Sequence, residues 1–323
     1  MDELLKDVAG FIRKGSTLDA LKVVVCRAPD DVKEKAKRLF ENPNAIRSLD
    51  EWWVDLLSLI YYAHISRQSQ PVTRLGIAAR AVSSLTAAKL SRKLNIPELE
   101  AIFLLSGAKA LILMEMRDRA EICYLKAEEI LRDLVKRDES FLRELADVLN
   151  NLGIIYLEMN ERERCERYLK EALEIGKRLT DESILPILAQ TLNNLALLYK
   201  EMERYDDAVK FFDEAERIYR KLVERDEIYA VELAVVLCNY SVLCKVIGKY
   251  EKAESLYKEA LTIFKKLTEK DILYGSGVID VLISLVRLYY RDMKRYDEAE
   301  RYMRTINQEI KELIARMLEL PRA

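Results

Sequence analysis

The chain of 323 residues is 50% hydrophobic and 33% charged, a composition that excludes a disordered protein and allows a sizeable core. Its 53 Lys and Arg residues are balanced by 55 Asp and Glu, so the basic excess typical of nucleic-acid binding is missing. Only 9 glycines and 6 prolines occur, which is too few for the turns of a β-sandwich or barrel. An all-α protein is therefore predicted.

Residues 1–47 predict three short helices, at about residues 2–13, 17–27 and 31–41, with breaks at Gly15, Pro29 and Asn42-Pro43. We predict that this segment is an N-terminal cap, because an array of stacked helices must cover its open apolar end.

Residues 48–95 predict a single degenerate helical hairpin. The sequence Ser48-Leu49-Asp50-Glu51 has the pattern of a capping box and predicts a helix from there to about Arg67. The chain is expected to turn at residues 68–70 and to begin a second helix at Pro71. Asn95 is expected to cap the helix that follows.

Residues 96–323 contain five copies of one sequence unit. The second and third copies, LNNLGIIYLEMNERERCERYLKEAL and LNNLALLYKEMERYDDAVKFFDEAE, align without a gap. Equivalent leucines follow at spacings of 45, 43, 45 and 45 residues: Leu104, Leu149, Leu192, Leu237 and Leu282. The last copy has one extra residue before Tyr296. We predict five long two-helix repeats, the last with an extended C-terminal helix.

Small and large residues keep the same positions in each copy. The small ones are Ala120, Cys165, Ala208, Ala253 and Ala299, and the large ones are Tyr124, Leu169, Phe212, Tyr257 and Met303. Two helices pack at 8–10 Å where small side chains meet, and neighbouring units must stack to bury their faces. Aspartates at the joints are predicted to cap each new helix: Asp138, Asp181, Asp226 and Asp271.

This small and large pattern, seen in Gly153, Tyr156, Cys165, Leu169 and Ala172, resembles the tetratricopeptide repeat. The unit of about 44 residues is longer than the usual 34 and is similar to the repeats of kinesin light chain and of Rap-type regulators. Most pattern glycines are replaced by Ala, Ser or Val, and the usual repeat-ending proline is missing. The resemblance implies a right-handed superhelical array of antiparallel helix hairpins, a TPR-like α-solenoid.

The resemblance also implies that the first helix of each hairpin lines a concave groove. Five of the ten asparagines stand in these helices: Asn150, Asn151, Asn193, Asn194 and Asn239. Asparagine in a helix interior is unfavourable by roughly half a kcal/mol relative to alanine, so a compensating interaction is expected. The amides either grip the backbone of an extended peptide, as in the long-repeat families, or tie neighbouring helices together.

Further groove-facing candidates lie one or two turns along the same helices. They are Lys200, Lys245, Arg287, Tyr290 and Arg291, opposed by Glu158 and Glu201. This half of the groove is mildly basic, which favours an acidic partner segment unless the face is simply solvated.

The C-terminal helix, from about residue 296 to residue 318, has apolar residues at helical spacing: Ile306, Ile310, Leu313, Ile314 and Met317. This stripe either covers the last repeat or meets a partner helix, with self-association of the chain as one outcome. The oligomeric state is otherwise not predicted.

The sequence contains no motif for catalysis, and we predict no enzyme, cofactor or metal site. His64 is the only histidine, and the five cysteines include no CxxC pair. The N-terminus lacks an apolar signal region and no apolar run approaches membrane-spanning length, so a cytoplasmic protein is predicted. The scarcity of glutamine, four residues in all, suggests a thermophilic source.

The sequence therefore favours a scaffold or adaptor that holds a protein or peptide segment in the groove. The alternative is a regulatory sensor whose superhelix changes shape when it binds a peptide or other ligand. An RNA-binding helical repeat ranks below both, because the charge is balanced and the unit is long. No nucleic acid and no membrane is expected as a partner.

Overall fold

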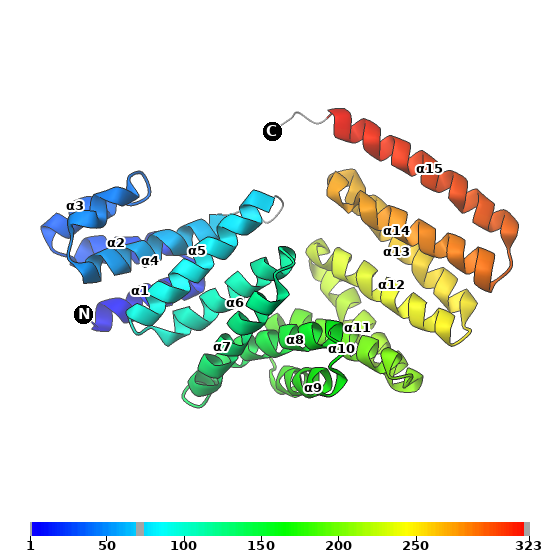
Figure 1. Ribbon diagram of the computed structural model, residues 1–323, viewed down its shortest axis with the longest axis horizontal. Coiled ribbons are helices and arrows are strands. Elements are labelled where there is room, and N and C mark those ends of the chain that lie inside the picture. Colours follow the sequence, from blue (N-terminus) through cyan, green and yellow to red (C-terminus); the bar gives the residue numbers. More distant parts are fainter. Residues whose placement is uncertain (1, 69–73, 320–323) are drawn as a thin grey trace. The chain divides into compact units, whose positions relative to one another are not determined.

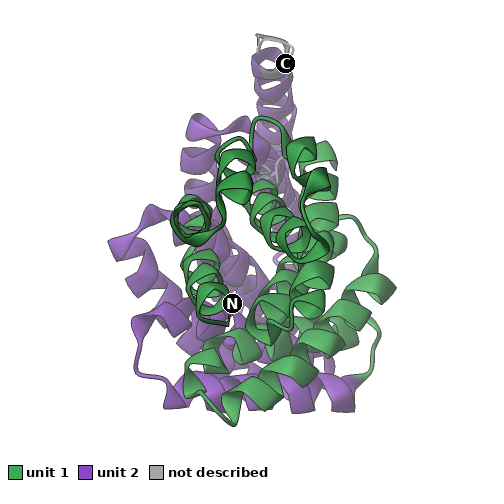
Figure 2. Cartoon of the chain, turned by 90° about the vertical axis from the view of Figure 1, so that its left-hand side faces the viewer, with its two compact units in different colours: residues 1–161 green, residues 162–323 purple. Residues whose placement is uncertain are grey.

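The computed structural model describes residues 2–68 and 74–319, and within these ranges all regular structure is helical (Figure 1). The predicted all-α array of antiparallel hairpins is confirmed. The chain divides into two compact units, residues 1–161 and 162–323, which are coloured separately in Figure 2 and described one at a time.

The N-terminal unit begins with the three predicted short helices, α1 (Asp2–Lys14), α2 (Thr17–Arg27) and α3 (Asp30–Lys37), followed by the 3-10 helix η1 (Pro43–Ser48). The hairpin α4 (Glu51–Gln68) and α5 (Arg74–Lys93) comes next. The expected turn after Gln68 and the helix start at Pro71 lie outside the described residues. The unit continues with α6 (Pro97–Leu113), α7 (Arg117–Val135), η2 (Glu139–Phe141) and α8 (Leu142–Glu158).

The N-terminal helices pack on the two hairpins that follow them, through contacts between α2 and α4 and between α1 and α6. His64 of α4 belongs to this contact, because its Nδ1 lies 3.0 Å from the Thr17 hydroxyl and its ring lies 4.3 Å from that of Phe40. The single histidine is thus a packed helical residue. The division into 1–47, 48–95 and 96–323 stays a prediction.

The C-terminal unit consists of further hairpins. Its elements are α9 (Arg162–Arg178), η3 (Glu182–Ile184), α10 (Leu185–Glu201), α11 (Tyr205–Arg225), η4 (Glu227–Tyr229), α12 (Ala230–Val246), α13 (Tyr250–Lys270), η5 (Ile272–Tyr274), α14 (Gly275–Arg287), the π-helical turn η6 (Leu288–Asp292) and α15 (Tyr296–Glu319). The pairs α10 with α11, α12 with α13 and α14 with α15 form three successive hairpins.

The repeated small and large residues form the core of these hairpins, as predicted, except for Met303 of α15, which is 53% exposed. Ala208, Phe212 and Ala215 on α11 are completely buried, and the Phe212 ring stacks on Tyr240 of α12 at a centroid distance of 5.2 Å. Small residues let the two helices approach, and the large residue between them fills the next layer.

The repeated aspartates also cap as predicted, although each caps a short 3-10 turn that leads directly into the next α-helix. The Asp226 carboxylate accepts a hydrogen bond from the backbone N–H of Ile228, at 3.0 Å. Asp138, Asp181 and Asp271 make the same bond to the residue two positions further on.

From α6 onward the turn of each hairpin contains one residue in the left-handed conformation, at Glu115, Asn160, Glu203, Gly248 and Lys294, and Asn95 has the same conformation between α5 and α6. The prediction that Asn95 caps the next helix is wrong for this reason. Its φ of 55° places it in the turn, and Ile96 stands at the N-cap of α6 without a side-chain cap. Asparagine tolerates this conformation better than most residues, which explains its occurrence there.

The extra residue of the last copy is absorbed in the π-helical turn Leu288–Asp292 at the end of α14. Leu282 and Tyr296 are separated by fourteen residues, whereas Leu237 and Tyr250 in the preceding copy are separated by thirteen. A π turn accommodates one residue without breaking the helix. The hairpin therefore keeps its turn and its partner helix α15.

In each of the last four repeats a tyrosine of the first helix, or of the π-helical turn that ends it, is hydrogen-bonded to a carboxylate of the preceding second helix. Tyr199 donates to Glu166 at 2.7 Å and Tyr289 donates to Glu254 at 2.8 Å, both within the C-terminal unit. Tyr156 donates to Glu121 at 2.8 Å in the N-terminal unit. These bonds join successive hairpins beside the buried core.

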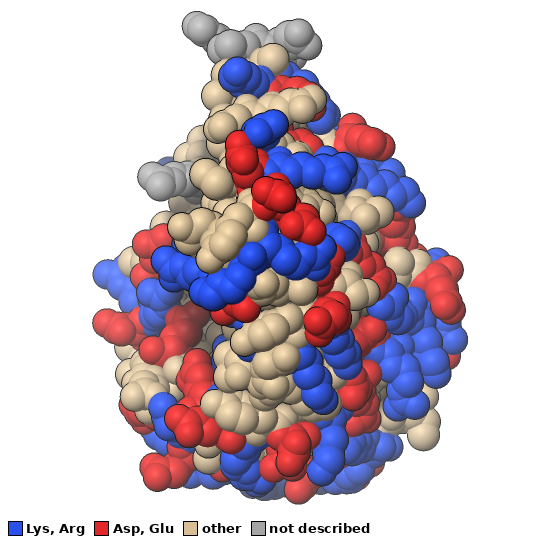
Figure 3. All heavy atoms as spheres, turned by 90° about the vertical axis from the view of Figure 1, so that its right-hand side faces the viewer, with Lys and Arg blue, Asp and Glu red and all other residues tan. Residues whose placement is uncertain are grey.

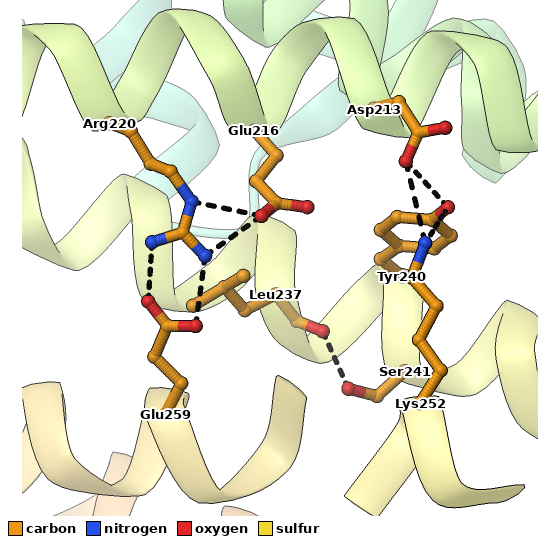
Figure 4. A network of polar contacts seen from close by, with 8 residues as sticks. All are labelled: Asp213, Glu216, Arg220, Leu237, Tyr240, Ser241, Lys252 and Glu259. Carbon is orange, nitrogen blue, oxygen red and sulfur yellow. Dashed lines mark hydrogen bonds and ion pairs between the residues drawn. The ribbon is translucent and has the colours of Figure 1, made fainter. Parts of the chain in front are cut away.

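In the α12 hairpin both partners of this bond are displaced by one helical turn. Tyr240 stands four residues before the position of the other tyrosines, and Asp213 of α11 stands four residues after that of the other acids. Their bond is 2.7 Å long (Figure 4). Because α11 and α12 run antiparallel, the two displacements cancel and the joint is preserved.

Two helices are long and apolar enough to cross a membrane by length and composition alone, Glu227–Val246 and Ile272–Asp292. The expectation that no segment approaches this length is therefore wrong. Both are first helices of repeat hairpins, packed against α11, α13 and α15, and 50% and 39% of the respective windows are buried. Core helices of helical repeats have this composition.

Candidate functional site

Three successive first helices, α10, α12 and α14, carry the candidate site in the C-terminal unit. Residues spaced by 4, 7 and 11 positions share one helix face. We call this face the first-helix surface and define it by Gln190, Asn194, Leu197 and Glu201 on α10, by Val235, Asn239, Val242 and Val246 on α12, and by Asp280, Ser284 and Arg287 on α14 with Arg291 in the π-helical turn η6 that follows it. Each residue has its counterpart at the same repeat position on the next helix.

The amides of this surface form hydrogen bonds between helices. Asn239 of α12 donates through Nδ2 to Oδ1 of Asn193 on α10, at 3.1 Å. Asn193 in turn donates to Oδ1 of Asn194, at 3.3 Å. Asn193 and Asn194 are only 8% and 6% exposed, whereas Asn239 is half-buried. One of the two roles considered for these residues, the tying together of neighbouring helices, is thus present in the structure.

In the N-terminal unit the two predicted asparagines of α8 differ from each other. Asn150 is completely buried and faces the core. Asn151 is half-buried, and its Nδ2 donates to the backbone oxygen and to the carboxylate of Asp147, at 2.7 and 2.8 Å. Asp147 also pairs with Lys109 at 2.6 Å. Of the two amides, only Asn151 can meet a ligand without rearrangement of the core.

The predicted basic residues have different environments. Lys200 and Lys245 are half-buried, and Lys245 lies 3.9 Å from the Asp292 carboxylate. Arg287 and Arg291 are exposed. Tyr290 lies in the π-helical turn, is 57% exposed and contacts Tyr296 edge-on at 5.2 Å.

The apolar part of the surface was not predicted from the sequence. Val235 and Val246 of α12 are 43% and 51% exposed, and Val242 between them is half-buried. Their signal in the sequence is the replacement of polar residues at the same positions of α10, Gln190 and Glu201, by valine. The Asn239 amide is therefore flanked by aliphatic side chains that are exposed to solvent.

Cys238 directly precedes Asn239 in α12. Burial raises the pKa of its thiol to about 12, and the nearby Asp280 carboxylate acts in the same direction. A thiol with a raised pKa is a poor nucleophile. Within the described ranges no group of three His, Cys, Asp or Glu side chains is placed to hold a metal ion.

The family model described as "Tetratricopeptide repeat" matches residues 144–221 and 188–266. These ranges contain the capped hairpins, the paired small residues and the first-helix amides described above. Residues 144–266 of this chain thus match the tetratricopeptide repeat family. Comparison with curated proteins finds no similar sequence.

Solved structures extend the likeness in fold beyond the matched ranges. Apo RapI has a TM-score of 0.59 at 16% identity, over 96% of this chain and 76% of RapI. NprR in complex with its cognate peptide NprX has a TM-score of 0.54 at 16% identity, over 93% and 79%. Aspartyl phosphate phosphatase F from Bacillus subtilis has a TM-score of 0.55 at 14% identity, over 95% and 93%. At these identities the likeness is one of fold, and it confirms the predicted similarity to Rap-type arrays.

Proposed function

We propose that this protein is a scaffold or adaptor that holds an extended segment of another protein on its first-helix surface. The observation that carries the proposal is the half-buried Asn239 with exposed valines on either side, on the middle one of three first helices. An amide both donates to a peptide carbonyl and accepts from a peptide N–H, so it binds the backbone without regard to the partner's side chains. The aliphatic flanks provide the apolar area that a stable complex needs.

The repeat positions support this arrangement. Asn194, Asn239 and Ser284 occupy one position on α10, α12 and α14. Asn239 and Ser284 are half-buried and Asn194 is 6% exposed, so a segment lying across the helices meets a hydrogen-bonding side chain on α12 and on α14. The bond from Asn239 to Asn193 holds the Asn239 amide in place before a ligand arrives. Preorganised groups lose less conformational entropy on binding. NprR, which shares the fold, was solved with its cognate peptide.

We expect the partner to be a protein or peptide and the protein to act without catalysis, in the cytoplasm. The charges on the visible face of the protein favour no polyanion, because acidic and basic side chains are interspersed over it (Figure 3). Asn151 of α8 occupies the repeat position of Asn194 and Asn239 in the N-terminal unit, and we expect it to make its own contact with a partner.

The proposal is tested by selecting peptides from a phage-displayed random dodecapeptide library on the protein and on the Asn194→Ala/Asn239→Ala variant. We expect sequences enriched on the wild type to lose at least about tenfold in binding to the variant, because the Asn239 amide that contacts the backbone is lost together with the buried Asn194 amide that is linked to it through Asn193. Asn307→Ala is the matched control, since Asn307 is an exposed mid-helix asparagine of α15. Equal enrichment on all three proteins would refute the proposal.

The second candidate is a regulatory sensor whose shape responds to the ligand. The contacts that favour it are ion pairs between successive hairpins, such as Arg220 with Glu259 at 2.6 Å and Arg295 with Glu254 at 2.7 Å (Figure 4 shows the first). Such pairs are partly exposed and each contributes little, so a bound ligand can shift the packing between hairpins. Small-angle scattering with a selected peptide tests this, and an unchanged radius of gyration would argue against a sensor.

A further inference from the structure

Near the C-terminal ends of the first helices the charge of the first-helix surface changes sign from α10 to the turn after α14, whereas Asp280, more than two turns earlier on α14, is an exposed acid. Glu201 and Val246 occupy the same repeat position near the C-terminal ends of α10 and α12, and Arg291 follows at the same spacing in the π-helical turn after α14, whose last residue is Arg287. A segment that lies across these helices therefore meets an acid on the first, an aliphatic side chain on the second and a base on the third.

These charges are not neutralised within the C-terminal unit. Glu201, Arg287 and Arg291 are exposed, and none of them makes an ion pair with a described residue of this unit. Other basic residues nearby are paired, as Lys245 is with Asp292 and Arg295 with Glu254. The unpaired charges are thus the ones available to a partner.

The middle of the surface is apolar. Val235 and Val246 lie on either side of Asn239, and both are about half exposed. At the repeat positions of Val235 and Val246, the preceding repeat has Gln190 and Glu201, and the following repeat has Asp280 and Arg291. An aliphatic side chain of the partner would cover them and remove apolar surface from water.

We propose, on the basis of the function proposed above, that the first-helix surface selects a segment with a basic residue over α10, an aliphatic residue over α12 and an acidic residue over α14. Packed helices lie roughly 8–10 Å apart and an extended chain advances about 3.3 Å per residue, so each helix corresponds to about three residues of the segment. The two charges of the segment are then about six residues apart, with the aliphatic residue midway.

The direction of the bound chain decides which charge comes first in the partner's sequence. Amides can bind a backbone that runs either way. Both orders, basic to acidic and acidic to basic, satisfy the charges on α10 and α14, whereas a segment with two like charges is repelled at one end. Exposed ion pairs are weak and screened by salt, so we expect opposite ends to improve the Kd about threefold to tenfold over like ends at low salt. The difference should shrink severalfold near 0.5 M salt.

The test uses the same random dodecapeptide library on the wild type, on Glu201→Lys and on Arg287→Glu/Arg291→Glu. Wild-type selection is expected to enrich one basic and one acidic residue about six positions apart. Glu201→Lys should replace the basic preference by an acidic one and leave the acidic preference unchanged, and Arg287→Glu/Arg291→Glu should do the converse. Because the substituted side chains are exposed, the variants are expected to fold, which circular dichroism will verify.

Glu224→Lys is the matched control, because it makes the same change of charge at an exposed site on α11, the second helix of the same hairpin. Its selected sequences should equal those of the wild type. Binding that depends on the amides but shows no charge pattern, or a pattern that Glu201→Lys does not alter, would overturn this inference and leave the proposed function standing. Enrichment that is indifferent to the amides would overturn both.

Discussion

The side chain of Asn239 is expected to matter little for stability, and this separates its binding role from a structural one. Replacing it by alanine removes one neutral hydrogen bond, the 3.1 Å contact with Asn193, whose net contribution is about 0.5–1.5 kcal/mol. Alanine in a helix interior recovers about 0.5 kcal/mol relative to asparagine. The free energy of unfolding should therefore fall by less than about 1 kcal/mol.

Asn193 is expected to behave differently because it is 8% exposed and bonds to both neighbouring amides. Asn193→Ala leaves the groups that it satisfied without partners in a buried place, at a cost of about 1–3 kcal/mol. A double-mutant cycle of Asn193 and Asn239 should give a coupling of about 0.5–1.5 kcal/mol.

Urea denaturation followed by circular dichroism measures all four proteins of this cycle. The comparison is valid where the m-value is unchanged. A loss of more than about 2 kcal/mol for Asn239→Ala would refute the reasoning, because it would show that the main role of the amide is to hold α10 and α12 together. A loss below about 1 kcal/mol together with lost peptide capture would agree with it.

Three further predictions concern the turns, the acid stability and the terminal helix. Glu203 has a φ of 59°, so Glu203→Gly should raise the free energy of unfolding by about 0.5–1 kcal/mol. Gly248 has a φ of 74°, so Gly248→Ala should lower the free energy of unfolding by about 1 kcal/mol. Changes of the opposite sign in urea denaturation would contradict these two predictions. Two lysines of α13 lower the pKa of Glu227 to about 2, below its ordinary value, so the stability that this contact gives is present above about pH 4.5 and is lost as the pH falls toward 2. Glu227→Gln should make acid unfolding less steep in that window, and an unchanged pH profile would be the contrary result. The exposed stripe of α15 should make the chain self-associate with rising concentration in sedimentation equilibrium, and Ile310→Glu should suppress this; a constant monomer mass for the wild type would exclude it.

The terminal helix shows why the sequence could not choose between the two roles of its apolar stripe. Leu313 packs so closely on Gly275 of α14 that a Cβ at residue 275 would collide with it, whereas Met303, Ile310 and Ile314 are exposed. The stripe is wide enough to do both, and helical spacing alone does not show which part faces the body of the unit.

The helices and their caps could be predicted because they follow from local rules. The repeat of small residues, the aspartates at the joints and the proline at the start of α6 each act within a few residues of themselves. Asn95 was misassigned because asparagine favours both a cap and a left-handed turn, and only the φ of 55° separates the two.

The details of the candidate site depend on distances between helices, which the sequence does not contain. The bond between Asn193 and Asn239 joins residues 46 positions apart, and the compensating shifts of Tyr240 and Asp213 are recognisable only once α11 and α12 are known to be antiparallel. The exposure of Val235 is likewise a property of the packed hairpins. What the sequence did supply was the repeat position at which all these residues stand.

NMR of the protein with selectively ¹⁵N-labelled asparagine side chains tests most directly whether these amides contact a bound peptide. The ten asparagines give few signals, which single substitutions assign. On addition of a peptide selected by the protein, the Asn239 and Asn194 side-chain signals are expected to shift, while those of Asn42, Asn44 and Asn307 stay in place. Titration to saturation with the Asn194 and Asn239 signals unmoved would contradict the claim that the first-helix surface holds the peptide backbone.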